Sequence, residues 1–184
     1  MSRPTSICVF CGSREGANPA YMAHATALGR ALASENWRLV YGAGDVGLMG
    51  AVARAAKDAG GDTFGVIPVH LMAREVAKRD LGQFIVTENM HERKKVMYMN
   101  SDALAVLPGG AGTLDEFFEV LTWRQLMLHA KPIYLLNTDG YWDPLAALID
   151  QVIDKGFADA SLRGFFDLAD SVEEMVTGLR SSLA

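Results

Sequence analysis

Short apolar runs alternate with longer amphipathic segments along the whole chain. The apolar runs have the length of β-strands, and several are continuous rather than alternating, as in SICVF and ALAVL. Continuous apolar runs are typical of strands that helices cover on both faces. The pattern predicts strands at Ser6–Phe10, Arg38–Tyr41, Thr63–Ile67, Phe84–Thr87, Ala103–Leu107, Pro132–Leu136 and Phe165–Leu168.

Segments with apolar positions at helical spacing lie between these strands. They predict helices at Ala20–Glu35, Leu48–Ala59, Met90–Asn100, Leu114–Leu128, Asp143–Asp154 and Val172–Leu183. Strands and helices that alternate in this way indicate an α/β fold with a doubly wound, mainly parallel sheet and helices on both faces. A length of 184 residues fits one domain, so we expect residues 1–184 to form a single Rossmann-like, nucleotide-binding domain.

Composition and charge exclude several classes of protein. Half of the residues are apolar and 21% are charged, which is the range of globular proteins. The net charge is −5 and the longest basic run is Arg93–Lys95, so we expect no nucleic-acid partner. No apolar run approaches the roughly 20 residues of a membrane span, and Met1–Ser6 lacks the apolar core of a signal peptide. We therefore expect a cytoplasmic protein without a membrane partner.

Cys8 and Cys11 form a C-x-x-C pair, which invites a redox or metal interpretation. Cys8 lies inside an expected strand, however, where residues three apart point to opposite faces. No second pair or nearby histidine completes a zinc site. We therefore expect two buried thiols and no metal.

Three of the expected strands end in loops of glycine and other small residues, at Cys11–Ser13, Gly42–Gly50 and Pro108–Thr113. In a parallel sheet the carboxyl ends of the strands meet at the edge where ligands bind, and a following helix offers N–H groups to an anion. One such loop would indicate only a tight turn. Three together favour a site for a nucleotide-like ligand that carries a phosphate.

The second loop contains G-x-G-x-x-G at Gly42–Gly47, after a strand and before a helix, which is the fingerprint of dinucleotide binding. The acid that binds ribose in such sites follows the second strand. Asp62 lies at about the right distance but precedes the strand Thr63–Ile67, and after Gly60-Gly61 it is better interpreted as a turn residue. NAD binding therefore stays a minor alternative.

The third loop opens the stretch Pro108-Gly-Gly-Ala-Gly-Thr-Leu-Asp-Glu116. It lacks the Gly-Lys-Ser/Thr ending of a P-loop, which removes support for hydrolysis of nucleoside triphosphates. Thr113 and Glu116 have the spacing of a capping box, a purely structural device. Against that interpretation, Asp115 adds a second acid where the loop should bind an anion. A carboxylate beside a phosphate cradle is useful when it acts on the sugar attached to that phosphate.

Arg93 shares one face of the expected helix Met90–Asn100 with Met90 and Met97. That face should point inward, whereas Lys95 points elsewhere. An inward arginine needs an acidic partner or an anionic ligand, so Arg93 forms either a structural ion pair or part of a binding site.

In these motifs the chain resembles the LOG family, the cytokinin-activating enzymes formerly described as lysine decarboxylase-like. The matches follow one another along most of the chain, and an Arg-Lys pair on one helix combined with P-G-G-x-G-T-x-x-E is a specific pattern. The matching stretches are Val9–Ser13, Gly44 with Gly47–Gly50, Met90–Lys94, Pro108–Glu116, Leu121–Gln125, His129–Pro132 and Leu136–Tyr141.

The resemblance implies a phosphoribohydrolase that cleaves the N-glycosidic bond of an N6-modified adenosine 5′-monophosphate into free base and ribose 5-phosphate. Arg93 and Glu116 match the pair regarded as catalytic, and Glu75 and Lys94 match positions that contact substrate. The chain departs from the family at Ala43, where a glycine is common. The positions that match the phosphate-binding loop are Gly109, Gly110, Gly112 and Thr113.

The older description as a decarboxylase does not suit the residues. Pyridoxal catalysis needs a Schiff-base lysine in a cofactor pocket, and of the six lysines only Lys94 lies in the motif region. We therefore expect hydrolysis without a cofactor or metal. Glycosidic cleavage passes through an oxocarbenium-like sugar, for which Glu116 would stabilise charge or activate water. Arg93 would neutralise the departing base or orient the ligand.

The sequence leaves alternative functions and substrates open. The first is a nucleotide- or molybdenum-cofactor-binding protein on the same fold without catalysis, although the pair of Arg93 and Glu116 favours the enzyme. The sequence also leaves open whether the substrate is a cytokinin nucleotide or plain AMP. The resemblance further implies a homodimer, and the apolar surface of the expected helix Leu114–Leu128 places Trp123, Leu126 and Met127 near its interface.

Overall fold

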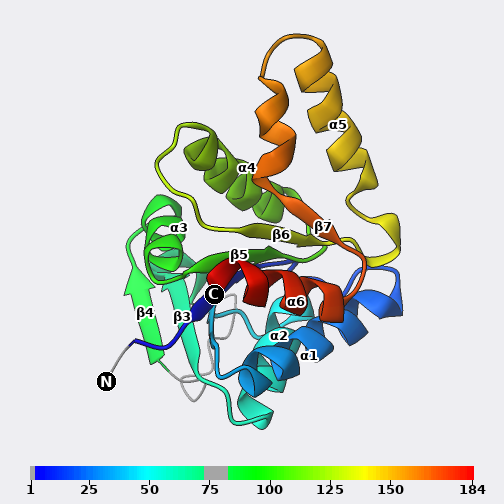
Figure 1. Cartoon of the computed structure of the whole chain (residues 1–184). Helices are drawn as coiled ribbons and strands as arrows, with labels where there is room; N and C mark the ends of the chain where they lie inside the picture. Colours follow the sequence, from blue (N-terminus) through cyan, green and yellow to red (C-terminus); the bar gives the residue numbers. More distant parts are fainter. Residues whose placement is uncertain (1–2, 73–82) are drawn as a thin grey trace.

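The fold is a layered α/β arrangement, seen in a computed structural model that describes residues 3–72 and 83–184 (Figure 1). The seven strands of the described residues form one sheet in the order β4-β3-β2-β1-β5-β6-β7, and every neighbouring pair is parallel. The predicted α/β class with a parallel sheet is confirmed. The strands are β1 (Ser6–Phe10), β2 (Arg38–Tyr41), β3 (Thr63–Pro68), β4 (Gln83–Thr87), β5 (Ala103–Val106), β6 (Ile133–Leu136) and β7 (Asp167–Ala169).

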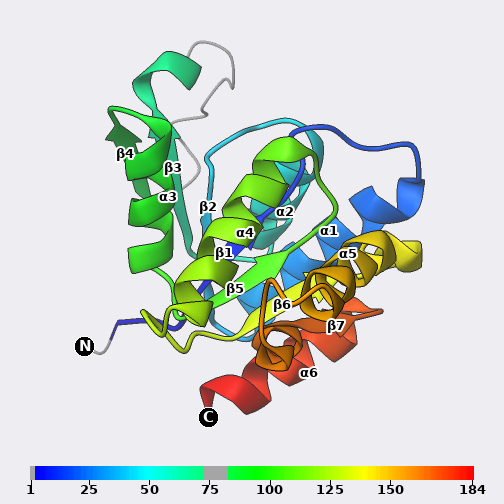
Figure 2. The same ribbon diagram turned by 90° about the horizontal axis from the view of Figure 1, so that it is seen from above.

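Helices connect the strands and cover both faces of the sheet. Helices α1, α2 and α6 supply one apolar layer and α3, α4 and α5 supply the other, as Figures 1 and 2 show. Short 3₁₀ turns, η1 (Val69–Leu71), η2 (Thr138–Gly140) and η3 (Ala160–Phe165), complete the described elements. The helices are α1 (Pro19–Ser34), α2 (Gly47–Asp58), α3 (Met90–Met99), α4 (Ala111–Gln125), α5 (Asp143–Asp154) and α6 (Val172–Leu183).

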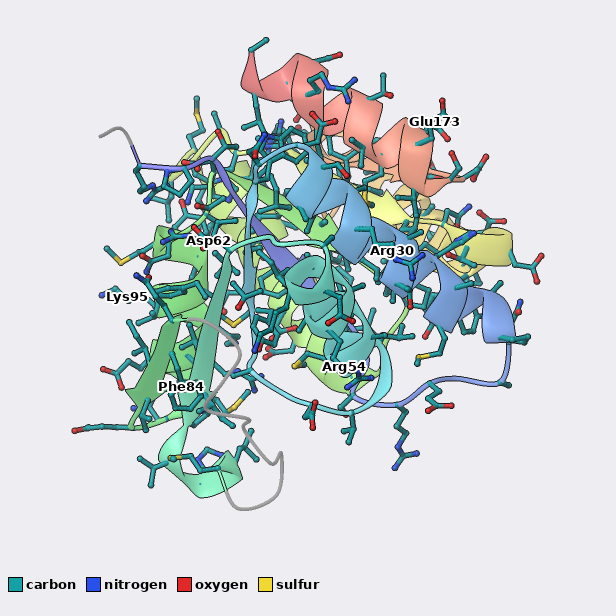
Figure 3. All side chains as sticks on the ribbon, turned by 90° about the horizontal axis from the view of Figure 1, so that it is seen from below. Arg30, Arg54, Asp62, Phe84, Lys95 and Glu173 are labelled. Carbon is teal, nitrogen blue, oxygen red and sulfur yellow. The ribbon has the colours of Figure 1, made fainter. Side chains whose placement is uncertain are left out.

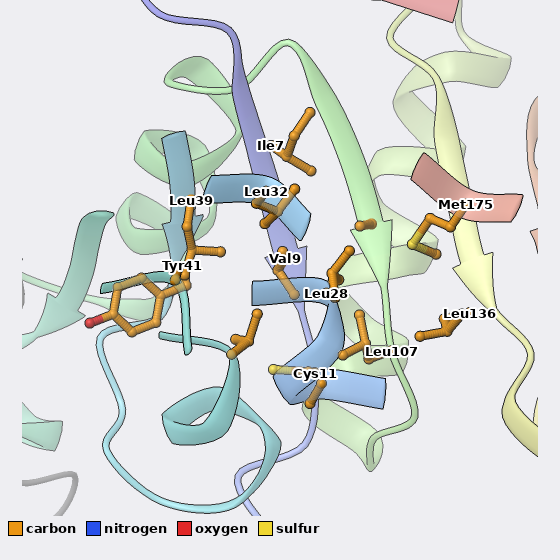
Figure 4. Close-up of a cluster of buried hydrophobic side chains, with 14 of the residues drawn as sticks. Ile7, Val9, Cys11, Leu28, Leu32, Leu39, Tyr41, Leu107, Leu136 and Met175 are labelled. Carbon is orange, nitrogen blue, oxygen red and sulfur yellow. The ribbon is translucent and has the colours of Figure 1, made fainter. Parts of the chain in front are cut away.

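The central strand β1 is buried on both faces of the sheet, which explains why its sequence is apolar from Ile7 to Phe10. Ile7, Val9 and Cys11 pack in the layer with α1 and α2, while Cys8 and Phe10 pack in the layer with α3, α4 and α5. Figure 4 shows the first three among the leucines of α1. Both cysteines are free and buried, on opposite faces of the sheet, as their spacing predicts.

The outer surfaces of the helices carry many charged residues. Figure 3 views the face formed by α1, α2 and α6, where Arg30 and Glu173 lie on the solvent side. Within residues 3–72 and 83–184, no helix has the length and apolar character that crossing a bilayer requires.

The strand order reverses beside β1. The chain proceeds from β1 outward to β4, then returns to place β5 on the other side of β1. Ligands of open parallel sheets bind at such a reversal, beyond the carboxyl ends of the strands. The loops that follow β1 and β5 meet there, since the N–H of Gly12 donates to the carbonyl of Pro108 at 3.0 Å.

Candidate active site

A cavity of about 500 Å³ opens at the carboxyl ends of β1 and β5. Residues 11–16 after β1, which include the charged Arg14 and Glu15, and the small residues 108–113 after β5 line it, and Arg93 and Glu116 reach it from α3 and α4. The volume falls in the range of about 300–1,000 Å³ that small-molecule sites occupy. Sequence motifs from separate elements therefore meet in one place.

Helix α4 begins inside the glycine loop, three residues earlier than predicted. Its N-cap is Gly110, and no side chain caps it. The alternative interpretation of Thr113 and Glu116 as a capping box is therefore wrong, because Thr113 lies inside the first turn and Glu116 in the second. Because residues 110–113 line the cavity, the first N–H groups of α4 are available to an anion there.

Gly109 and Thr113 fit against each other under this loop. A Cβ on Gly109 would overlap the hydroxyl of Thr113 and crowd the backbone of Gly12. Thr113 is 3% exposed, so its hydroxyl is held at the floor of the cavity. The glycine at 109 is needed for this close approach of two loops.

Glu116 and its neighbour Asp115 point in different directions. Glu116 is buried at 9% exposure and lines the cavity. The side chain of Asp115 is 62% exposed and accepts a hydrogen bond from Lys94 Nζ at 2.9 Å. Successive residues of a helix do not share a face, so only one of the two adjacent acids reaches the cavity.

Arg93 lies on the inward face of α3, as its spacing with Met90 and Met97 predicts. It is 4% exposed and lines the cavity. Its Nη2 donates to the carbonyl of Gly42 at 2.8 Å, and its Nη1 lies 3.8 Å from the sulfur of Met90. A Cβ at Gly42 would overlap the guanidinium, so this glycine makes room for Arg93.

The charges of Glu116 and Arg93 both act on the buried thiol of Cys11. Burial raises the pKa of the Cys11 thiol above its ordinary value, the Glu116 charge raises it further, and Arg93 acts in the opposite direction. Both charges therefore reach the same buried thiol. All three residues line the cavity, and the raised pKa keeps the Cys11 thiol protonated.

Lys94 does not line the cavity. Its Nζ lies 2.9 Å from Asp115 Oδ2 and 2.9 Å from Glu119 Oε2, and its side chain is 7% exposed. Burial alone would lower the pKa of Lys94, but hydrogen bonds to these two carboxylates outweigh it and raise the pKa. Lys94 ties α3 to α4 and so sets the helices that carry Arg93 and Glu116 side by side.

The remaining predicted contact, Glu75, lies outside the described residues. Gly109, Gly110, Gly112 and Thr113 all line the cavity, as do Arg93 and Glu116. Of the sequence-predicted site residues that the structure describes, Lys94 alone is directed elsewhere.

The loop Gly42–Gly50 contributes less than its fingerprint suggests. Only Leu48 and Met49 of this segment line the cavity. Gly47 is required by packing rather than by a ligand, because a Cβ at this position would overlap the backbone of Ser13. Ala43 has φ 59°, a conformation that favours the glycine common in the family at this position.

The structure does not support Asp62 as the ribose-binding acid that the alternative of NAD binding requires. Asp62 precedes β3, so it lies at the amino end of that strand and away from the carboxyl edge where the cavity opens (Figure 3). The backbone carbonyl of Asp62 accepts a hydrogen bond from the N–H of Leu39 in β2, so Asp62 takes part in the pairing of β2 with the start of β3.

Several residues that line the cavity were not predicted as site residues from the sequence. An apolar wall combines residues from three elements, Leu48 and Met49 from α2, Leu71 from η1 and Met90 from α3. Tyr141 comes from the turn after β6. Tyr141 lies in a stretch that matches the family, but periodicity gives no signal for it. Among the residues described, no cluster of side chains has the composition of a metal site.

Comparisons with curated proteins extend over nearly the whole chain. The model of a family described as "Possible lysine decarboxylase" matches residues 49–179. The chain is 45% identical to "Probable cytokinin riboside 5′-monophosphate phosphoribohydrolase LOG4" from Oryza sativa subsp. japonica, over 97% of this chain and 78% of that protein. It is 44% identical to "Cytokinin riboside 5′-monophosphate phosphoribohydrolase LOG5" from Arabidopsis thaliana, over 98% of this chain and 79% of that protein.

Solved structures with this fold include carriers of a cofactor. The molybdenum cofactor carrier protein of Chlamydomonas reinhardtii superposes with a TM-score of 0.77 at 25% identity, over 98% of this chain and 99% of that one. The molybdenum cofactor binding protein of the phototrophic bacterium Rippkaea orientalis superposes with a TM-score of 0.72 at 27% identity, over 100% of both chains.

Proposed function

The chain belongs to the LOG family, and on this premise we propose that it hydrolyses the N-glycosidic bond of adenosine 5′-monophosphates, with a preference for those that carry an N6 substituent. The products are the free base and ribose 5-phosphate. The observation that carries the proposal is the buried carboxylate of Glu116, which lines the cavity beside an uncapped helix N-terminus and has no capping role of its own.

The chemistry follows from what lines the cavity. The 5′-phosphate binds the N–H groups at the start of α4, where the helix dipole favours an anion. The bond from C1′ of the ribose to the base nitrogen breaks, and water adds its oxygen to C1′ while a proton passes to the base. Glu116 stabilises the oxocarbenium-like sugar or activates the water. Arg93, held by the carbonyl of Gly42, neutralises the departing base or orients the nucleotide.

The apolar wall supports the preference for an N6 substituent. Leu48, Met49, Leu71 and Met90 line the cavity, and methionines adapt to irregular apolar groups. An isopentenyl group that leaves water against such side chains gains about 0.8 kcal/mol per buried CH₂. Plain AMP has no group to fill this space.

The test is base release from isopentenyl-AMP and from AMP, measured side by side with the wild-type protein. We expect free base from both, with kcat/KM about tenfold or more in favour of isopentenyl-AMP. Equal values would contradict the preference, and no free base from either nucleotide would contradict the proposed reaction.

A second candidate is a carrier of the molybdenum cofactor without catalysis, favoured by the whole-chain likeness to the Chlamydomonas protein. A carrier can keep the phosphate-binding loops, but it has no need of Glu116 and Arg93 in the same cavity. Binding of a phosphorylated pterin without base release from any nucleotide would favour this candidate.

Lysine decarboxylation fits the residues poorly. A pyridoxal enzyme needs a lysine amino group free to form a Schiff base. The Nζ of Lys94 lies between the carboxylates of Asp115 and Glu119 and outside the cavity lining. The family description therefore names a chemistry that this lysine does not support.

We also propose that the protein acts as a cytoplasmic homodimer. Beyond the end of α4, Leu126, Met127 and Leu128 are 63%, 89% and 68% exposed, which makes an apolar surface suited to association. Trp123, expected beside them, is only partly exposed and packs edge to face against Tyr98 at 5.0 Å.

The expected mass in solution at micromolar concentration is about twice the 19.9 kDa of one chain. Light scattering checks it, and Met127→Glu should shift the mass toward one chain because it places a charge in the interface. Phe157→Glu, which changes an equally exposed apolar residue after α5, serves as the control. A mass near 19.9 kDa for the wild type would contradict the dimer.

A further inference from the structure

The loop that begins α4 has almost no side chains with which to hold its own shape. Gly109, Gly110, Ala111 and Gly112 follow one another. Glycine loses more conformational freedom on folding than any other residue. A binding loop of this kind needs hydrogen bonds from outside, because an ill-defined loop would have to be ordered each time a ligand binds.

Three successive carbonyls of this loop each accept a hydrogen bond from a different element. The Pro108 carbonyl accepts from Gly12 N–H at 3.0 Å, after β1. The Gly110 carbonyl accepts from Leu114 N–H at 3.1 Å, within α4. Between them, the Gly109 carbonyl accepts from the hydroxyl of Tyr141 at 2.6 Å. The first two bonds come from backbone, and the third comes from a side chain.

The Tyr141 side chain is 36% exposed, and two neighbouring rings orient it. The turn η2 reverses the chain after β6 with Asp139 at φ 56° and Gly140 at φ 71°. The Tyr141 ring packs edge to face against Tyr21 at 5.6 Å and against Trp142 at 4.8 Å. With its ring fixed on two sides, the hydroxyl reaches the loop from a defined direction.

We propose that Tyr141 is a positioning residue for the phosphate-binding loop, a role that rests on the proposed binding of a 5′-phosphate in this cavity. A peptide unit is planar, so fixing the carbonyl of Gly109 also fixes the direction of the N–H of Gly110. Gly110 is the N-cap of α4 and lines the cavity. Tyr141 thereby orients a backbone donor that belongs to the phosphate cradle.

The role of the hydroxyl is separable from that of the ring. Tyr141→Phe keeps both aromatic contacts and removes only the bond to Gly109. Tyr134→Phe is a matched control, because the Tyr134 hydroxyl contacts Ser182 Oγ at 3.1 Å, away from the cavity lining. Each variant loses one tyrosine hydroxyl bond, but only one of them touches the loop.

The experiment is calorimetric titration with ribose 5-phosphate and with adenine, beside steady-state kinetics on AMP. We expect Tyr141→Phe to weaken ribose 5-phosphate about tenfold, the usual scale of one lost hydrogen bond, and to leave adenine affinity unchanged. The phosphate is bound equally before and during the reaction, so KM should rise about tenfold with kcat changed less than about threefold. Tyr134→Phe should match the wild type in all three measurements.

Several results would overturn the inference. Wild-type affinity of Tyr141→Phe for ribose 5-phosphate would do so, as would an equal loss of adenine affinity, which would show that the hydroxyl does not act on the phosphate-binding loop alone. A wild-type protein that does not bind ribose 5-phosphate would overturn it as well. If the wild type binds ribose 5-phosphate but releases no base, the proposed reaction fails while the titrations still decide the role of Tyr141.

Discussion

Glu116→Gln should lower turnover by about 100-fold or more while the protein keeps its fold and binds nucleotide nearly as well as the wild type. The change preserves the size of a side chain that is 9% exposed and removes its charge. That charge faces the oxocarbenium-like sugar of the transition state, where a neutral amide gives little stabilisation. Glu116 lies in the second turn of α4, beyond the N-cap residue Gly110, so the change removes no capping bond, and the melting temperature should move by no more than a few degrees.

Base release from isopentenyl-AMP measures this effect, and Asp115→Asn is its control. Asp115 carries the same charge one residue earlier, but its side chain is 62% exposed and pairs with Lys94 outside the cavity lining. Lys94 keeps Glu119 as a partner at 2.9 Å, so Asp115→Asn should retain activity. Equal activity of Glu116→Gln and wild type, with equal stability, would contradict the mechanism.

Arg93→Gln is expected to reduce kcat/KM by about 100-fold, the scale for removing a charged donor from a water-poor site. Arg93 is 4% exposed and is fixed by the Gly42 carbonyl, so its charge acts in a buried setting. Lys95→Gln is the matched control, since it removes a positive charge from an exposed position of the same helix. Arg93→Gln with wild-type kcat/KM would show that Arg93 serves the fold alone.

The kinetic pattern of Arg93→Gln separates its two proposed roles. A fall in kcat indicates that Arg93 neutralises the departing base, whereas a rise in KM with kcat unchanged indicates that it orients the bound nucleotide. Gly42→Ala provides a second approach, because its Cβ would displace the guanidinium without removing it. We expect this variant to lose activity in the same parameter as Arg93→Gln.

The sequence predicted the fold well because a strand or helix that is buried has a recognisable pattern of apolar residues. SICVF is buried at every position and apolar from Ile7 to Phe10 because β1 is covered on both faces, and apolar runs likewise mark β5 and β6. The helical spacing that joins Arg93 to Met90 and Met97 also follows from local geometry, so the inward direction of Arg93 could be predicted without the structure.

The start of α4 shows where local reasoning fails. Glycine disfavours helix, so propensity places the first turn after Thr113, whereas the helix begins at Ala111. Contacts from other elements override that propensity, since Gly109 fits between Thr113 and the backbone of Gly12. This shift removes the capping role of Glu116 and leaves its carboxylate to the cavity.

Lys94 is a second residue whose position the sequence did not predict, because it was expected to contact substrate and does not line the cavity. It is adjacent to Arg93 in the sequence, and the motif groups the two, but neighbouring residues of a helix point in different directions. Which of them meets the cavity depends on where α4 packs, and the carboxylates of Asp115 and Glu119 attract Lys94 away from it.

By itself the sequence determined the parallel α/β sheet, the glycine loops at its carboxyl edge, and the residues Arg93 and Glu116 that share the cavity. These follow from periodicity and from short motifs, which are properties of neighbouring residues. Only the tertiary structure decided that Tyr141 reaches the Gly109 carbonyl, 32 positions away in the chain. Such contacts depend on the order of strands in the sheet and on helix packing, and no local pattern encodes the distance between two elements that meet only after folding.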